Sequence, residues 1–150
     1  MRIPMWAQNL VLQVAIDEGR DDLPELTWRK RHKQRLTAGM KAFIARDPDR
    51  ARRWAKHTVA EGSSGRTFKP YSLFKPDRVH VTAGSDRKDQ KLVLLHELAH
   101  WLLPAGEHHG ADFWDKAWEL YRRYKVPIRY AKAREGNYRK GAIAAYRRSR

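Results

Sequence analysis

The stretch HELAH, residues 96 to 100, constrains the fold of this chain more than any other feature of its sequence. The segments on both sides of it, LVLL and WLL, are uncharged, so a helix over this region is predicted to be buried on most of its surface. On such a helix His96 and His100 are four residues apart and lie on one face. Buried imidazoles and a buried carboxylate need partners that satisfy them. The fold must therefore enclose a polar site here, and the simplest alternative is a core helix with two hydrogen-bonded histidines.

The spacing of these residues is that of the HExxH motif, in which two histidines on one helix face hold a single metal ion. Glu97 lies between them in sequence and is predicted to be the general base that takes a proton from activated water. Zinc suits two neutral nitrogen donors without thiolates, and the chain contains no cysteine. The motif therefore predicts a zinc site with His96 and His100 as ligands, and hydrolysis as the reaction.

A catalytic zinc ion normally takes a third protein ligand and leaves the fourth position to water. A metzincin requires glycine and histidine where this chain has Leu103 and Gly106, so that class is excluded. A thermolysin-like site takes a glutamate from a later helix, and Glu119 lies at a suitable separation for that role. The spacing leaves five candidates for the third ligand: Glu107, His108, His109, Asp112 and Glu119.

HELAH is followed, after a short loop, by HGADF at residues 109 to 113. The pair of motifs resembles the SprT-like (Spartan-type) metallopeptidases, in which HExxH precedes a His-Gly-x-x-aromatic signature. The resemblance covers roughly residues 66 to 125. It implies that His96, His100 and His109 hold zinc, with His108 as a solvated neighbour.

The same resemblance implies a zincin-like enzyme that hydrolyses peptide bonds in a protein or peptide substrate. It implies that Gly110 permits a tight turn after the ligand and that Phe113 anchors the next helix in the core. In zincin folds an edge strand lines up the substrate backbone, and residues 78–82 are the candidate for that strand. Many family members carry a cysteine zinc ribbon after the peptidase core, whereas this chain has a basic segment there. Two alternatives remain: a nucleic-acid-binding module braced by structural zinc, and a zinc hydrolase of non-peptide substrates.

The remaining patterns predict one α+β domain over residues 1–150, mainly helical with a small sheet. It divides into a helical N-terminal part (residues 1–62), a zincin-like core (63–125) and a basic C-terminal segment (126–150). Helices are predicted over about residues 4–20, 25–46, 48–62, 85–104 and 111–125, and strands over 66–74 and 78–84. In the C-terminal segment an apolar stripe of helical spacing predicts that this segment also docks on the core.

The charge of the chain is lopsided, with 32 Lys and Arg against 17 Asp and Glu, a net +15. Residues 121–150 hold eleven of the basic residues and one acid, Glu135. Such an excess favours a polyanion, and DNA bound without sequence specificity is predicted ahead of an anionic membrane or protein surface. Tyrosines among these charges are suited to stacking on exposed bases. The residues expected to contact nucleic acid are Arg29, Lys30, Arg31, Arg139, Lys140, Arg147 and Arg148.

The N-terminal stretch only faintly resembles a signal peptide, because Gln8, Asn9 and Gln13 interrupt its apolar run. Nowhere in the chain does an apolar segment approach the length of about 18 residues that is needed to cross a bilayer. A cytoplasmic location is therefore expected.

Overall fold

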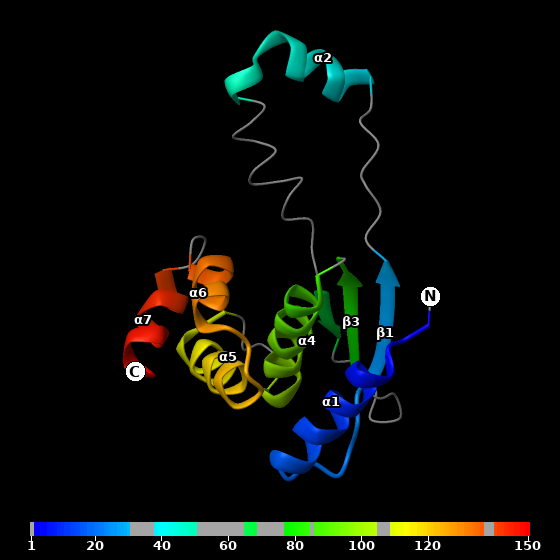
Figure 1. Cartoon of the computed structure of the whole chain (residues 1–150), viewed down its shortest axis with the longest axis vertical. Helices are drawn as coiled ribbons and strands as arrows, with labels where there is room; N and C mark the ends of the chain where they lie inside the picture. Colours follow the sequence, from blue (N-terminus) through cyan, green and yellow to red (C-terminus); the bar gives the residue numbers. More distant parts are fainter. Residues whose placement is uncertain are drawn as a thin grey trace.

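Helix α4 (Arg87–Leu102) lies between a small β-sheet on one side and a group of helices on the other (Figure 1). The computed structural model describes residues 2–30, 38–50, 65–68, 77–84, 86–104, 109–136 and 140–150. The other elements are α1 (Met5–Asp17), β1 (Glu25–Lys30), α2 (Ala38–Arg46), β2 (Gly65–Phe68), β3 (Arg78–Ala83), α5 (Ala111–Arg123), α6 (Ile128–Gly136) and α7 (Lys140–Arg148). Most of the described residues are helical and the sheet is small, so the predicted α+β class is confirmed.

The sheet has the strand order β1-β3-β2. Strand β1 pairs with β3 in parallel, with Trp28 opposite Val81, and β2 pairs with β3 antiparallel, with Thr67 opposite Val79. Strand β3 is therefore the central strand, and the prediction that residues 78–82 form an edge is wrong. The edges of the described sheet are β1 and β2, and β2 also packs against α4.

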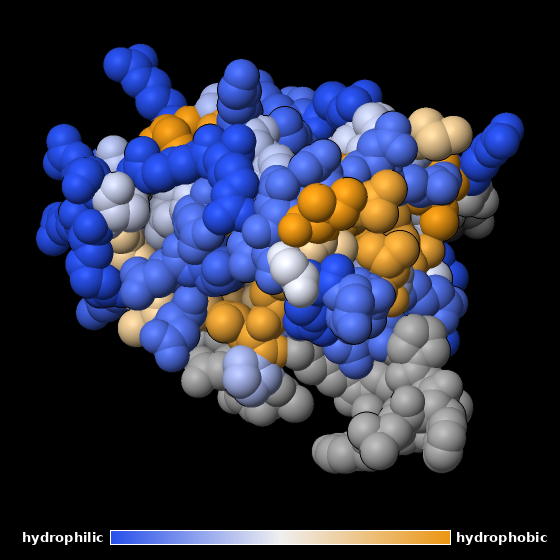
Figure 2. All heavy atoms as spheres, turned by 90° about the horizontal axis from the view of Figure 1, so that it is seen from below, coloured by the Kyte–Doolittle hydropathy of each residue, from blue (hydrophilic) through white to orange (hydrophobic). Residues whose placement is uncertain are grey.

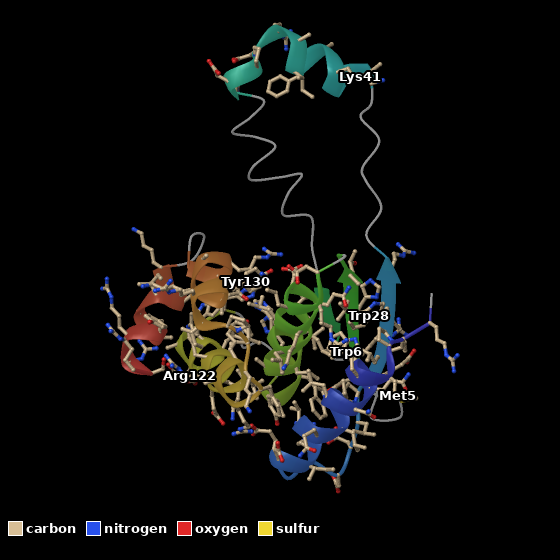
Figure 3. The ribbon with its side chains drawn as sticks, viewed as in Figure 1. Met5, Trp6, Trp28, Lys41, Arg122 and Tyr130 are labelled. Atoms are coloured by element: carbon tan, nitrogen blue, oxygen red, sulfur yellow. The ribbon has the colours of Figure 1, made fainter. Side chains whose placement is uncertain are left out.

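Residues Glu25–Lys30 form strand β1, although the sequence pattern predicted one helix over residues 25–46. Thr27 and Trp28 favour strands, and pairing with β3 satisfies backbone groups that a helix would otherwise satisfy. Trp28 is buried and packs edge-on against Trp6 of α1, with ring centroids 5.8 Å apart (Figure 3). The predicted helix is thus wrong for residues 25–30, where pairing with β3 overrides local periodicity, and correct for α2. The part of this prediction over residues 31–37 lies outside the described residues.

Asp86 is the N-cap residue of α4, because its side chain accepts a hydrogen bond from the backbone N–H of Lys88 at 2.9 Å. Helix α5 buries one broad apolar face, and the aromatic rings on it (Phe113, Trp114, Trp118 and Tyr121) are among the largest fully buried side chains. The basic C-terminal segment docks on α5, because the indole N–H of Trp118 donates to the carbonyl of Ala142 in α7 at 2.9 Å. The core therefore continues from the sheet through α4 and α5 to α7.

Helix α1 begins after Pro4, as the sequence predicts, and packs beside α4. Its inner face is buried through Ala7, Val11, Val14 and Ala15. The outer face leaves Met5, Leu12 and Ile16 exposed. Figure 2 shows apolar side chains on the face of the molecule seen from below. Within the described ranges, no helix combines the length and apolar character that crossing a bilayer requires.

Candidate metal centre

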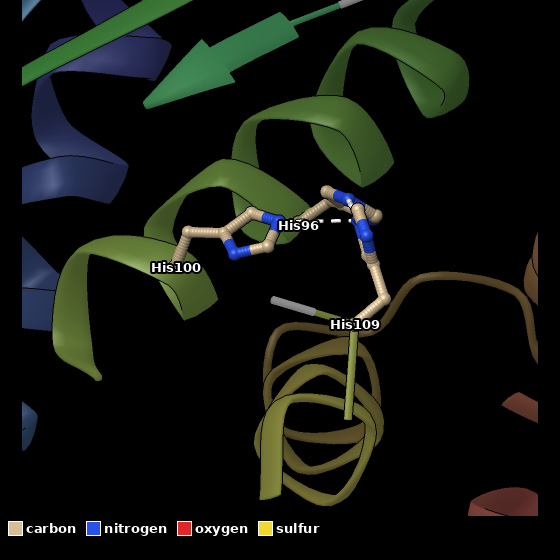
Figure 4. Close-up of side chains that lie close together, drawn as sticks. All are labelled: His96, His100 and His109. Carbon is tan, nitrogen blue, oxygen red and sulfur yellow. Dashed lines mark hydrogen bonds between the residues drawn. The ribbon is translucent and has the colours of Figure 1, made fainter. Parts of the chain in front are cut away.

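Three imidazoles converge where α4 meets the start of α5 (Figure 4). His96 and His100 project from α4, and His109 directly precedes the N-cap residue of α5. The Nε2 atom of His109 lies 3.1 Å from Nε2 of His96 and 3.2 Å from Nε2 of His100. One ligand atom of each histidine lies within 4.8 Å of those of the other two. The structure therefore brings the three predicted histidines close enough to bind one metal ion.

The separations between these nitrogens fit a tetrahedral ion. Zinc–nitrogen bonds of about 2.0–2.1 Å place two ligand nitrogens about 3.3 Å apart on a tetrahedron. The observed separations of 3.1 and 3.2 Å are close to that value. Neutral imidazoles without thiolates suit a divalent ion of borderline softness, and three ligands leave one position of the tetrahedron open.

Phe113 of α5 packs against all three imidazoles. Its ring centroid lies 4.8 Å from that of His96, 4.1 Å from that of His100 and 4.8 Å from that of His109. Phe113 is fully buried, as the resemblance implied, so it limits how far the imidazoles can rotate. Gly110 is the N-cap residue of α5 with φ −80°, a conformation open to any residue. The backbone dihedral angles of Gly110 therefore do not themselves require glycine at this turn.

Glu97 follows His96 on α4 and is 6% exposed. The hydroxyl of Thr67 in β2 lies 2.7 Å from its Oε2 atom and 2.9 Å from its main-chain carbonyl oxygen. A hydroxyl carries one hydrogen, so Thr67 shares this donor between the two acceptors. An edge strand of the sheet is thereby tied to the predicted general base.

A second buried carboxylate, Glu135 of α6, reaches the histidine cluster. Its Oε1 atom lies 2.9 Å from Nδ1 of His96, and the hydroxyl of Tyr121 donates to the same oxygen at 2.8 Å. Burial alone would raise the pKa of the Glu135 carboxyl, but the interactions with His96, Tyr121 and Arg134 outweigh burial and hold this pKa below its usual value. Burial, and then the charge of Glu135, raise the pKa of Tyr121 well above its usual value. At neutral pH Glu135 is thus an ionised acceptor and Tyr121 a donor.

Sequence reasoning missed three residues of this centre: Thr67, Tyr121 and Glu135. Glu135 carries a signal in the sequence, because it is the one acid among eleven basic residues in 121–150. Tyr121 is hidden within an apolar helical stripe, where a buried ring is the ordinary interpretation. Thr67 gives no signal, since its contact with Glu97 arises only when the strand packs on α4.

The other candidates for the third ligand differ in their surroundings. Among the described residues, His96, His100 and His109 make the single group that can hold a metal ion. Glu119 is directed elsewhere, since its carboxylate pairs with Lys116 at 3.2 Å and with Arg123. Asp112 is exposed in the first turn of α5. The last two candidates, Glu107 and His108, lie outside the described residues.

Those residues predicted to contact nucleic acid that the structure describes belong to two separate elements. Arg29 and Lys30 belong to β1, and the second group belongs to α7: Lys140, Arg147 and Arg148. Figure 1 places β1 and α7 on opposite sides of α4. In the second group Arg148 pairs with Asp115 at 2.9 Å, while Lys140 and Arg147 are exposed. Two predicted positions, Arg31 and Arg139, lie outside the described residues.

The described tyrosines among the basic residues of 121–150, which were predicted to stack on exposed bases, make contacts within the protein itself. The hydroxyl of Tyr124 donates to Asp17 at 2.6 Å, and that of Tyr130 donates to Asp89. The ring of Tyr146 packs on Trp118, with centroids 5.2 Å apart. These three rings are partly buried against the core. Tyr138, the fourth tyrosine among these charges, lies outside the described residues.

Comparison of the chain with protein-family models, with curated proteins and with solved structures gives no match. A function for the chain is therefore inferred from the residues and geometry of the metal centre.

Proposed function

We propose that this protein is a zinc-dependent metallopeptidase, with His96, His100 and His109 as ligands and Glu97 as general base. The observation that supports it most directly is the convergence of three imidazole nitrogens. Two of the histidines lie on α4, and the buried Glu97 follows the first of them on that helix. Structural zinc sites are closed by four protein ligands, whereas catalytic sites keep a position for water. The described residues offer three ligands, and a purely structural site has no use for a general base.

Zinc, when bound, supplies a Lewis acid that activates water and polarises a carbonyl group. In the proposed reaction the carboxylate of Glu97 accepts a proton from the attacking water and passes it to the leaving amine. Thr67 limits the rotation of that carboxylate through its hydrogen bond. Strand β2 takes the substrate-aligning role first expected of residues 78–82, because it is an edge strand packed on α4.

Glu97→Gln tests this proposal, because it keeps the shape of the side chain and removes its basicity. We expect the variant to keep about one zinc ion per chain, by elemental analysis, and to lose about 10²–10⁴-fold in cleavage of an unfolded protein substrate. His109→Ala is expected to lose zinc as well as cleavage. Glu119→Gln is the matched control, since it changes an exposed glutamate that pairs with Lys116, and both readouts should stay at the wild-type level.

The alternatives give different results in the same assay. If zinc only stabilises a binding module, the wild type and Glu97→Gln contain the same amount of zinc and neither protein cleaves the substrate. If the substrate is not a peptide, the wild type binds zinc but leaves protein substrates intact. Loss of zinc in Glu119→Gln would instead return the third position to a thermolysin-like arrangement.

The proposal also places this activity on or near nucleic acid. Ten of the fifteen net positive charges lie in residues 121–150, which include the described helices α6 and α7. In Figure 2 hydrophilic side chains dominate the end of the molecule formed by these helices. Lys140 and Arg147 are exposed there and form no ion pair with other described residues. Their charge supports contact with phosphates that does not depend on sequence.

A further inference from the structure

Glu135 connects α6 to the metal centre across 39 residues of sequence. It is 8% exposed, and a buried carboxylate is costly unless donors surround it. Two side chains lie at its Oε1 atom: Tyr121 of α5, whose hydroxyl is 2.8 Å away, and His96 of α4, whose Nδ1 is 2.9 Å away. Three helices therefore meet at one oxygen atom.

The position of the hydrogen between Glu135 and His96 follows from this geometry. Because the hydroxyl of Tyr121 donates to Oε1, that oxygen is an acceptor, and the hydrogen shared with His96 belongs to Nδ1. A neutral imidazole that carries its hydrogen on Nδ1 presents a lone pair at Nε2. The Nε2 atom of His96 is the one that lies 3.1 Å from Nε2 of His109. The contact therefore selects the tautomer of His96 that can bind a metal ion at the cluster.

Helix α6 also contacts α4 at residues other than Glu135. The guanidinium of Arg134 pairs with Asp89 of α4 at 3.1 Å, and the hydroxyl of Tyr130 donates to the same carboxylate. The ammonium of Lys88 in α4 lies 5.1 Å from the ring centroid of Tyr130. These interactions attach α6 to α4 at a separate point, so Glu135 is one of several described contacts between the two helices.

We propose that Glu135 is the positioning residue of the metal centre, fixing the tautomer and ring orientation of His96 for metal binding. The inference rests on the metal site of the proposed function, but not on the reaction carried out there. Carboxylates that accept a hydrogen bond from a ligating histidine typically strengthen metal binding by about 10–100-fold. The basic C-terminal segment thus completes the metal centre in addition to carrying charge.

Glu135→Gln tests the positioning role with two readouts that do not require enzymatic activity. Zinc affinity, measured by competition with a chromophoric chelator, is expected to fall by about 10–100-fold. In the metal-free protein, nitrogen-15 NMR of the histidine side chains should show less of the tautomer of His96 with hydrogen on Nδ1. Tyr130→Phe is the matched control, because it removes a hydrogen bond between α6 and Asp89 of α4 and leaves Glu135 and its partners in place. Its zinc affinity and its His96 tautomer should equal those of the wild type.

Two results would overturn the positioning role. One is a Glu135→Gln protein with wild-type zinc affinity and an unchanged His96 tautomer. The other is an equal loss of affinity in Tyr130→Phe, which would assign the effect to docking of α6. If Glu135→Gln does not fold by circular dichroism, Glu135→Asp replaces it, since it keeps the charge but shortens the reach to His96, and the same losses are expected. If Glu135→Gln shows these effects but the wild type cleaves no peptide, the proposed reaction is refuted and the positioning role stands.

Discussion

The hydroxyl of Thr67 is a single group whose removal should be measurable, because it donates to a carboxylate that is almost fully buried. Thr67→Val keeps the shape of the side chain and leaves Glu97 without this donor. We expect the free energy of unfolding to fall by about 1–3 kcal/mol, the usual cost of removing a hydrogen bond to a buried charged group. Urea denaturation of the two proteins measures the difference. Thr67→Ser keeps the hydroxyl and should lie much closer to the wild type, and a valine variant as stable as wild type would contradict the expectation.

Residues of the centre were predictable where their relation is local. His96, Glu97 and His100 follow from helical spacing alone, and His109 follows from a second motif nearby in the sequence. Glu135 was not predictable as a partner, because its contact with His96 depends on how α5, α6 and α4 pack together. The presence of one acid in a basic segment suggests a specific role for its carboxylate, but the sequence does not identify the residue that it contacts.

At the scale of elements, the exposed cations of α7 should carry a measurable part of any binding to nucleic acid. Each phosphate contact on a single strand contributes about 0.7 to the slope of log affinity against log salt concentration. We expect Lys140→Gln combined with Arg147→Gln to reduce that slope by about 1.4 for an oligo-thymidine strand, measured by fluorescence anisotropy. Arg2→Gln changes an exposed cation that is not among the predicted contacts, so it is the control and should leave the slope unchanged. An equal reduction by Arg29→Gln would show that the two basic groups bind one strand together.

The elements themselves show which sequence signals are reliable. Helices α4 and α5 were predicted because buried apolar residues recur at helical spacing and a capping aspartate precedes α4. Strand β1 was missed because Glu25–Lys30 was read as the start of the periodic pattern that continues into α2. What makes it a strand is β3, whose pairing residues follow more than fifty positions later. Long-range pairing of this kind leaves no local signature.

At the scale of the whole molecule, polar contacts connect α1, near the start of the chain, to α5, about one hundred residues later. Glu18, directly after α1, pairs with Lys116 at 3.1 Å and with Arg123 at 3.0 Å, both on α5. Next to these pairs the hydroxyl of Tyr124 donates to Asp17 at 2.6 Å. These polar contacts connect the C-terminal end of α1 to α5, the helix that follows the metal ligands. They therefore help to hold α1 and α5 in position relative to each other.

Tyr124 makes that junction sensitive to alkaline pH. Burial, and then the hydrogen bond to Asp17, raise the pKa of Tyr124 to about 12, against about 10 in an unfolded chain. The unfolded state therefore loses this proton first, and the stability that Tyr124 contributes is complete below pH 10 and is lost as the pH rises towards 12. After allowance for solvent screening at this partly exposed group, we expect Tyr124→Phe to be less stable than wild type by about 1 kcal/mol at pH 8. Urea denaturation at pH 8, 10 and 11.5 should show this difference shrinking towards zero, because every other titrating group is common to both proteins. A difference that stays constant with pH would mean that the Tyr124 hydroxyl titrates alike in the folded and unfolded chains.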